Sequence, residues 1–168
     1  GQLGPPGLRS EALRANAIVL MEIGDLRGAM SLADEALRHF DQEDESLAHA
    51  WAITTWTRLV TDHRHDLEAG LAGAESALAL FRKHKSAYGV MSCLVLVGFM
   101  LVHLGKQQRA IEAFSESIHL AMAGGFVVRA AESVAYVYSA NRQAGMRIMR
   151  RVLPEMRSSS LPQEFSIA

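Results

Sequence analysis

An amphipathic helical pattern recurs in this chain at a spacing of about forty residues. The segment DLRGAMSLADEALRHF from Asp25 aligns with DLEAGLAGAESALALF from Asp66 (66 − 25 = 41), and a third copy begins at Lys106 (106 − 66 = 40). Apolar residues in each copy lie three or four positions apart, the spacing that gathers them on one helix face. Because one copy cannot bury that face alone, the repeat predicts a stack of similar units.

The stretch Gly89–Leu104 is apolar almost throughout, with Ser92 and His103 as its clearly polar residues. Its sixteen residues span about 24 Å as a helix, which is short of the ~30 Å hydrocarbon core of a membrane. Gly105 and an amphipathic helical pattern follow it. We therefore interpret the stretch as the inner helix of a hairpin that neighbours cover on both sides, and we expect no membrane association.

The pattern predicts an all-α fold, a right-handed α-α superhelix of about four antiparallel helical hairpins. We expect a flexible lead-in over residues 1–9, a repeat domain over 10–157 and a tail over 158–168. Ser10 should cap the first helix, Gly145 should break the chain between the last two helices, and Pro154 should interrupt the last one. The hairpins are expected at residues 10–43, 44–84, 86–124 and 126–157.

Charge and cysteine content argue against several classes of function. The 17 basic and 18 acidic residues give a net charge of −1, which provides no electrostatic reason to bind nucleic acid or an anionic membrane. The single cysteine, Cys93, excludes an internal disulfide and fits a reducing compartment, so we expect a cytoplasmic protein. No nucleophile elbow, phosphate loop or zinc-protease motif is present, and we expect neither catalysis nor a cofactor.

The third unit resembles a tetratricopeptide repeat. The residues that carry this resemblance are Val97-Gly98, Leu101, Leu104-Gly105, Ala110 and Phe114. The first unit matches more weakly, and the second departs from the pattern, with Arg58 and His65 where the family places glycine. The period near forty exceeds the family's ~34 and is similar to that of helical arrays in bacterial regulators, such as maltose-activator-like transcription factors.

The resemblance implies that the first helix of each unit lines a concave groove. An alternative is that Val95, Phe99 and Val102 are ordinary core between helices. The groove positions carried over from the family are Glu11, Arg14, Ile18, Met21, Ala52, Thr55, Leu59, Asp62, Ser92, Val95, Phe99, Val102, Glu132, Ala135, Ser139 and Arg142.

Three other groups of residues are candidates for a binding role. Of Trp51 and Trp56, one should belong to the core and the other can serve as an exposed binding anchor. The run His63-x-His65-Asp66 contains metal-ligand types, but two or three ligands on one turn are more typical of a solvated turn, and we predict no metal site. The last helix is basic, which fits contact with nucleic acid, contact with an acidic protein, or a solvated terminal face; its arginines are Arg147, Arg150, Arg151 and Arg157.

From these patterns we expect a non-catalytic scaffold or regulatory module that binds a protein or peptide in the groove. One alternative is a self-associating module that forms a homodimer. Another is a sensing domain of a bacterial signalling or transcription regulator that holds a small apolar ligand near Phe99.

Overall fold

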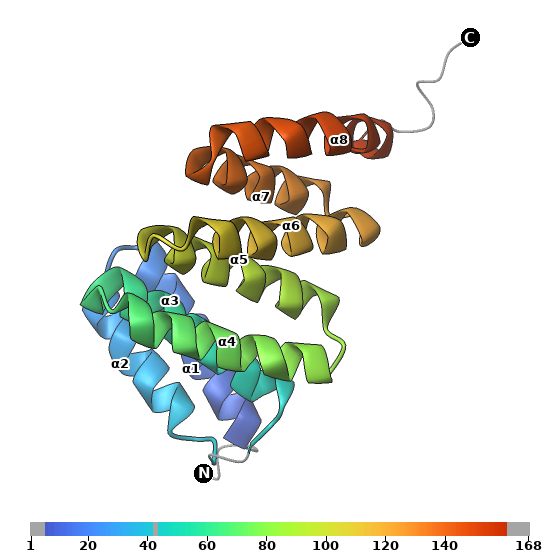
Figure 1. Cartoon of the computed structure of the whole chain (residues 1–168). Coiled ribbons are helices and arrows are strands. Elements are labelled where there is room, and N and C mark those ends of the chain that lie inside the picture. The colour runs from blue at the N-terminus through green and yellow to red at the C-terminus, as the bar shows by residue number, and fades with distance from the viewer. Residues whose placement is uncertain (1–5, 42–43, 161–168) are drawn as a thin grey trace. The chain divides into compact units, whose positions relative to one another are not determined.

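The protein is built from α-helices alone over the residues that the computed structural model describes, 6–41 and 44–160 (Figure 1). This confirms the predicted all-α class. The eight helices of these residues are α1 (Pro6–Glu22), α2 (Leu26–Leu37), α3 (Leu47–Arg64), α4 (Leu67–Lys83), α5 (Ala87–His103), α6 (Gln107–Ala123), α7 (Val127–Ala140) and α8 (Arg142–Ser160).

Consecutive helices pack together as hairpins, as the repeat predicts. Contacts join α1 to α2, α3 to α4 and α7 to α8, and the ring of Phe114 on α6 lies against Gly98 on α5. The chain divides into two compact units, Gly1–Leu96 and Val97–Ala168, which are described separately below. In the first unit, α3 also contacts both α1 and α2, and in the second, α6 contacts both α7 and α8.

The aspartates that open the first two copies of the repeat are helix caps. Asp25 Oδ1 accepts a hydrogen bond from the backbone N–H of Gly28 at 2.9 Å, and Asp66 Oδ1 accepts one from Ala69 at 2.9 Å. Each bond satisfies a backbone donor that has no partner within the first turn of its helix. The recurrence of Asp in the sequence therefore marks the start of the second helix in each of these hairpins.

Several helices end at a residue in the left-handed region of backbone conformation. Gly24 and Gly105 have φ values of +87° and +71°, so both serve as turn glycines between the two helices of a hairpin. His65 occupies the equivalent position after α3 with φ of 56°. Its backbone N–H donates to the carbonyl of Val60, which closes the helix despite the unfavourable side chain.

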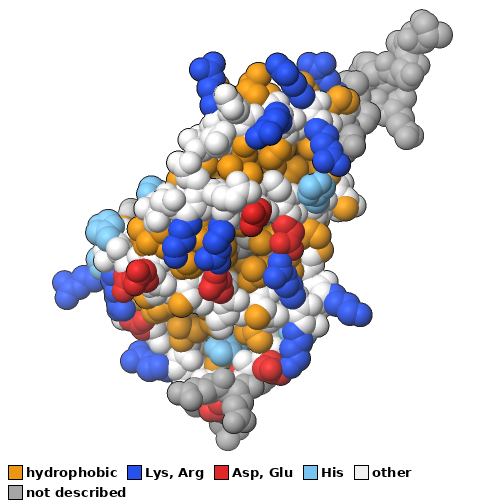
Figure 2. Space-filling view, viewed as in Figure 1, with side chains coloured by type: hydrophobic (Ala, Val, Ile, Leu, Met, Phe, Trp, Pro, Cys, Tyr) orange, Lys and Arg blue, Asp and Glu red, His pale blue; other side chains and the backbone are white. Residues whose placement is uncertain are grey.

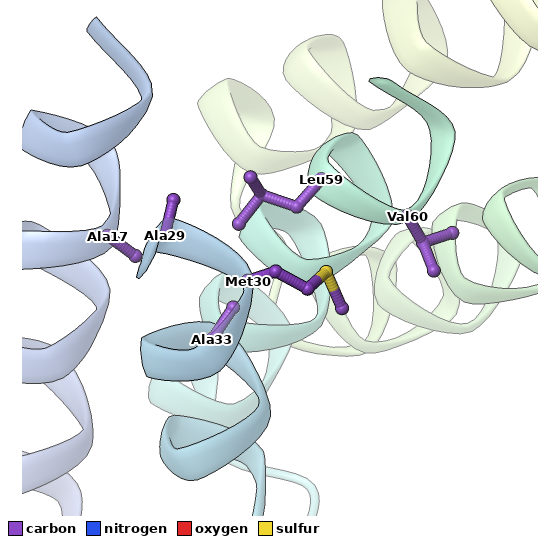
Figure 3. Packing of buried hydrophobic residues seen from close by; sticks show 6 residues of the cluster. All are labelled: Ala17, Ala29, Met30, Ala33, Leu59 and Val60. Atoms are coloured by element: carbon purple, nitrogen blue, oxygen red, sulfur yellow. The ribbon is translucent and has the colours of Figure 1, made fainter. Parts of the chain in front are cut away.

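The core of the first unit is a cluster of small and large apolar residues from α1, α2 and α3. In Figure 3, Met30 extends from α2 towards the helix that carries Leu59 and Val60. The alanines on α1 and α2 allow these helices to approach closely. The buried members of the cluster are Ala17, Ala29, Met30, Ala33, Leu59 and Val60.

A polar link joins α2 to α3 at the edge of this cluster. The Trp56 indole N–H donates to Asp34 Oδ1 at 2.9 Å, and the Arg64 guanidinium donates to Asp34 Oδ2 at 3.1 Å. Trp56 also packs against the apolar cluster. Of the two tryptophans, Trp56 is therefore the one that contributes to the core.

The prediction that Gly145 breaks the chain is wrong. α7 ends at Ala140, and α8 begins at Arg142, so Gly145 lies inside α8. A Cβ on Gly145 would lie 2.4 Å from the Cα of Tyr138, which shows that this glycine is needed for close contact between α7 and α8. The turn is made instead at Asn141, whose Oδ1 accepts a hydrogen bond from the Ala144 N–H at 2.9 Å.

The expected ends of the array also differ from the structure. α1 begins at Pro6, so the predicted lead-in is helical from that residue, and Ser10 is buried within the helix rather than capping it. α8 continues through Pro154 to Ser160, so part of the predicted tail is helical. Pro154 lies on an exposed face, where water can hydrate the carbonyl that loses its helical donor. Residues 1–5 and 161–168 lie outside the described residues.

Candidate functional site

The side chains of α1, α3 and the start of α5 meet at Trp51. The guanidinium carbon of Arg14 on α1 lies 5.9 Å from the centroid of the Trp51 ring, within the range of a cation–π interaction. The Tyr88 ring on α5 lies 5.9 Å from the Trp51 ring, centroid to centroid, at an interplanar angle of 41°. We call Arg14, Trp51 and Tyr88 the Trp51 face.

Phe81 supports the Trp51 ring from the interior. The two rings meet edge to face with centroids 4.6 Å apart, and Phe81 is fully buried. Gly89 allows α5 to start close to this ring, because a Cβ there would lie 2.2 Å from Phe81 Cδ1. Trp51 is half-buried, while Tyr88 is 42% exposed. The Trp51 ring is thus held by a rigid apolar neighbour on one side and borders an exposed tyrosine on another.

Glu11 fixes the orientation of the Arg14 guanidinium. Arg14 Nε donates to Glu11 Oε2 at 3.0 Å, and its Nη2 donates to Oε1 of the same carboxylate. The side-chain hydrogen bond from Arg14 lowers the pKa of Glu11; burial opposes this shift, and the charge of Arg14 supports it. Two of the five guanidinium N–H groups are engaged in this way. The Arg14 side chain is 19% exposed, and no other acceptor among the described residues is bonded to it, so its remaining donors have no partner within that part of the chain.

The structure places the predicted groove residues of the first unit in different environments. Ile18, Ser92 and Val95 are half-buried, and Asp62 is exposed. Met21 packs against the apolar cluster of α1, α2 and α3.

The predicted register on α3 is wrong at Leu59 and Ala52. Both are buried, at 0% and 1% exposure, so neither can contact a partner. Thr55 is also buried, and its hydroxyl donates to the carbonyl of Trp51 at 3.2 Å. A shift of one residue rotates a side chain by about 100° around a helix. The more accessible face of α3 therefore carries Trp51 and Arg58 in place of those residues.

In the second unit, exposed residues lie on α5 and α7. Phe99 is 38% exposed, with its ring centroid 4.5 Å from that of His103, and Val102 is half-buried. Glu132 on α7 is exposed and accepts a hydrogen bond from Arg129 at 3.1 Å.

The C-terminal end of α7 carries the remaining predicted positions. Ser139 is exposed, and its hydroxyl donates to the carbonyl of Tyr136 at 2.8 Å. The structure places Arg142 at the first residue of α8 rather than on the helix that the prediction assigned it to, because α7 ends at Ala140. Ala135 is exposed on α7.

Two aromatic residues, one on α5 and one on α7, were absent from the predicted groove. Tyr88 lies one turn before Ser92 on α5, and Tyr136 on α7 stacks on Phe114 with centroids 5.5 Å apart. The helical spacing from Tyr88 to Ser92 and Val95 was visible in the sequence. The family pattern starts its groove one turn later, which is why Tyr88 was missed.

The run from His63 to Asp66 forms the junction between α3 and α4. All its side chains are exposed, and Asp66 is engaged as the cap of α4. Over the described part of the chain, no group of three or more His, Cys, Asp or Glu side chains is arranged to hold a metal ion.

Cys93 is enclosed in α5 and is poorly suited to act as a nucleophile. Burial raises the pKa of its thiol to about 11, and the hydrogen bond with Thr54, at 3.5 Å between Oγ1 and Sγ, opposes this shift. The thiolate is therefore scarce near neutral pH.

None of the helices within the described residues has the length and apolar character required to cross a membrane.

Comparisons with known proteins bear on the fold. No protein-family model matches the chain, and no curated protein matches it. Among solved structures, the chain is similar to the crystal structure of BtubC (BKLC) from P. vanneervenii, with a TM-score of 0.70 and 18% sequence identity. The alignment covers 97% of this chain and 67% of that chain. At this identity the likeness supports the all-helical fold and carries no statement about function.

Proposed function

We propose that this chain is a tetratricopeptide-like module that binds a segment of another protein through the Trp51 face. The observation that carries the proposal is the position of the Arg14 guanidinium over the Trp51 ring, beside the exposed Tyr88. Tryptophan, tyrosine and arginine are the residue types most enriched at the energetic centres of protein interfaces.

Two of the three side chains of the Trp51 face are held by neighbours in the first unit. Phe81 holds the Trp51 ring, and the Glu11 carboxylate holds the Arg14 guanidinium. A partner that binds there loses little side-chain entropy on the protein side, so more of the contact energy appears as affinity. The chemistry suits an apolar or aromatic side chain on the Trp51 and Tyr88 rings, with a carbonyl or carboxylate oxygen accepting from Arg14.

The proposed kinship with tetratricopeptide repeats rests on residues of the third hairpin. The family pattern pairs a glycine in the first helix with an aromatic residue in the second, and Gly98 and Phe114 are in direct contact here. Leu104 and Gly105 stand at the turn, where Gly105 takes its left-handed conformation. These features support the assignment to the tetratricopeptide repeats. The likeness to BtubC alone supports only the all-helical fold.

The test is a selection of displayed peptides on the full chain, followed by affinity measurements on variants. Tyr88→Ala and Arg14→Ala should each weaken the selected peptides by about tenfold or more, as truncation of an interface centre does. Tyr138→Ala is the matched control, because Tyr138 is a comparably exposed tyrosine, at 37%, in the second unit. The affinity of the Tyr138→Ala variant for the selected peptides should stay within about twofold of that of the wild type.

Two outcomes would contradict this proposal. The first is a selection in which every binder tolerates Tyr88→Ala as well as it tolerates Tyr138→Ala. The second is a concentration-stable dimer by light scattering that Tyr88→Ala dissociates, because this face would then serve self-association. A small apolar ligand near Phe99 would be indicated instead if a hydrophobic compound raised the melting temperature of the wild type but not of Phe99→Ser.

A further inference from the structure

α8 is strongly basic in a chain that is slightly acidic overall. It contains five arginines and one acidic residue, Glu155, which gives it a net charge of +4 (5 − 1), whereas the whole chain has a net charge of −1. Its arginines are Arg142, Arg147, Arg150, Arg151 and Arg157.

Helix stability does not account for the arginines at positions 142 to 151. Arg142 is the first residue of α8, where the helix dipole disfavours a positive charge. Arg147 and Arg151 are four residues apart, a spacing at which like charges repel along a helix. Within the described part of the chain, no carboxylate forms an ion pair with Arg142, Arg147 or Arg150. Their positive charge is therefore open to an external anion.

The same surface of α8 also exposes apolar side chains. Val152 and Ala144 are buried, while Met146, Met149 and Leu153 are 39%, 37% and 37% exposed. Positions 146, 149 and 153 share one face of a helix. Figure 2 shows orange apolar side chains among blue basic ones over α8. A hollow in this surface is lined by Arg142, Gln143, Met146, Arg147 and Arg150.

We propose that the outer face of α8 docks an acidic amphipathic segment of a partner protein. Carboxylates of that segment would pair with Arg147 and Arg150, since guanidinium binds a carboxylate through two parallel hydrogen bonds. An apolar side chain between them would enter the hollow and contact Met146, whose flexible thioether adapts to irregular surfaces. This surface lies in the second unit and is independent of the Trp51 face.

The side chains favour an acidic protein over other anionic partners. A membrane would require a broad apolar face, whereas Met146, Met149 and Leu153 are each more than half covered. Single-stranded nucleic acid is usually bound with aromatic stacking, and α8 contains no aromatic residue. Two α8 helices of different copies would place like charges together, which disfavours a symmetric α8 contact.

The test uses displayed peptides of about 16 residues, or four to five helical turns, selected on the full chain. Arg147→Gln with Arg150→Gln removes the charge, and Met146→Gln removes the apolar contact while keeping a good helix former. The matched control is Arg27→Gln with Arg38→Gln, two exposed arginines of the first unit. Circular dichroism verifies that each variant remains helical. Peptides that lose affinity for Tyr88→Ala bind at the Trp51 face. A failure of the α8 proposal can therefore be distinguished from a failure of the proposed function.

We expect a class of acidic peptides with apolar residues at helical spacing. These peptides should bind the Arg147/Arg150 variant about tenfold or more weakly, and the control variant within about twofold of the wild type. The proposal is overturned if no peptide shows this dependence. It is also overturned if the arginine variant loses binding only to a short DNA duplex, only to phosphatidylcholine–phosphatidylserine vesicles, or only to a second copy of the chain in light scattering.

Discussion

Phe114 lies so close to Gly98 that a Cβ on Gly98 would be 2.6 Å from the Cε1 atom of the ring. Phe114 is 1% exposed, so the ring cannot swing out into solvent. The contact joins α5 to α6 and explains why this hairpin requires glycine in the middle of an apolar helix.

Gly98→Ala should therefore destabilise the protein by about 1–3 kcal/mol through overpacking. Without the contact, the same change would stabilise the helix by about 1 kcal/mol, because alanine is the better helix former. Urea unfolding of Gly98→Ala, Phe114→Leu and the double variant measures the coupling. The loss of unfolding free energy caused by Gly98→Ala should be smaller when Phe114 is leucine. The contact would be contradicted if Gly98→Ala were more stable than the wild type, or if the losses from the two single changes simply added up in the double variant.

The turn after α3 should gain stability when His65 is replaced by glycine. His65 adopts φ of 56°, which costs a residue with a side chain about 1–2 kcal/mol, and its side chain is exposed. Since glycine also makes the unfolded chain more flexible, we expect a net gain of about 0.5–1 kcal/mol. Thermal unfolding provides the measurement. Gly105→Ala, the reverse change at a position with φ of +71°, should lower the melting temperature.

Cys93 should make the protein less stable as the pH rises above about 9. Burial raises the pKa of the folded thiol from 9.0 to about 11, so between these values the unfolded chain loses a proton that the folded chain keeps. Stability from this residue is complete below the unfolded pKa and falls by about 1.4 kcal/mol per pH unit through that window.

The measurement is the difference in unfolding free energy between the wild type and Cys93→Ala at several pH values. The difference cancels the titration of other groups, such as lysine and tyrosine. It should shift in favour of Cys93→Ala from pH 9 to pH 11. A difference that is constant with pH would show that the Cys93 thiol titrates normally in the folded protein.

The sequence alone predicted the spacing of the repeat, and the structure shows the local chemistry behind that spacing. Asp25 and Asp66 stand in register because each caps a helix, and Gly105 stands at a turn because it adopts a positive φ. Such residues act on neighbours within a few positions, so their roles are visible in the chain itself.

Features that depend on packing between helices were harder to predict. Gly145 has the spacing of a turn glycine, yet it serves a close approach to Tyr138 that only the folded structure reveals. Leu59 and Trp51 differ by eight positions, and choosing which of them faces the core requires the position of α1. From residue type alone, either Trp51 or Trp56 could be the anchor, whereas the contacts of Trp51 with Arg14 and Tyr88 join three helices that are distant in sequence.

The most direct test of the proposed function is the position of the two tryptophan indole N–H signals in NMR spectra during a titration. The ligand is a peptide from the displayed selection, and Trp56→Phe identifies which signal belongs to Trp51. Because Trp56 donates to Asp34 inside the first unit, its signal should stay in place while the Trp51 signal moves with the bound fraction. If the peptide binds while the Trp51 signal remains fixed, the partner lies elsewhere on the molecule, and the assignment of the Trp51 face as the binding site is wrong.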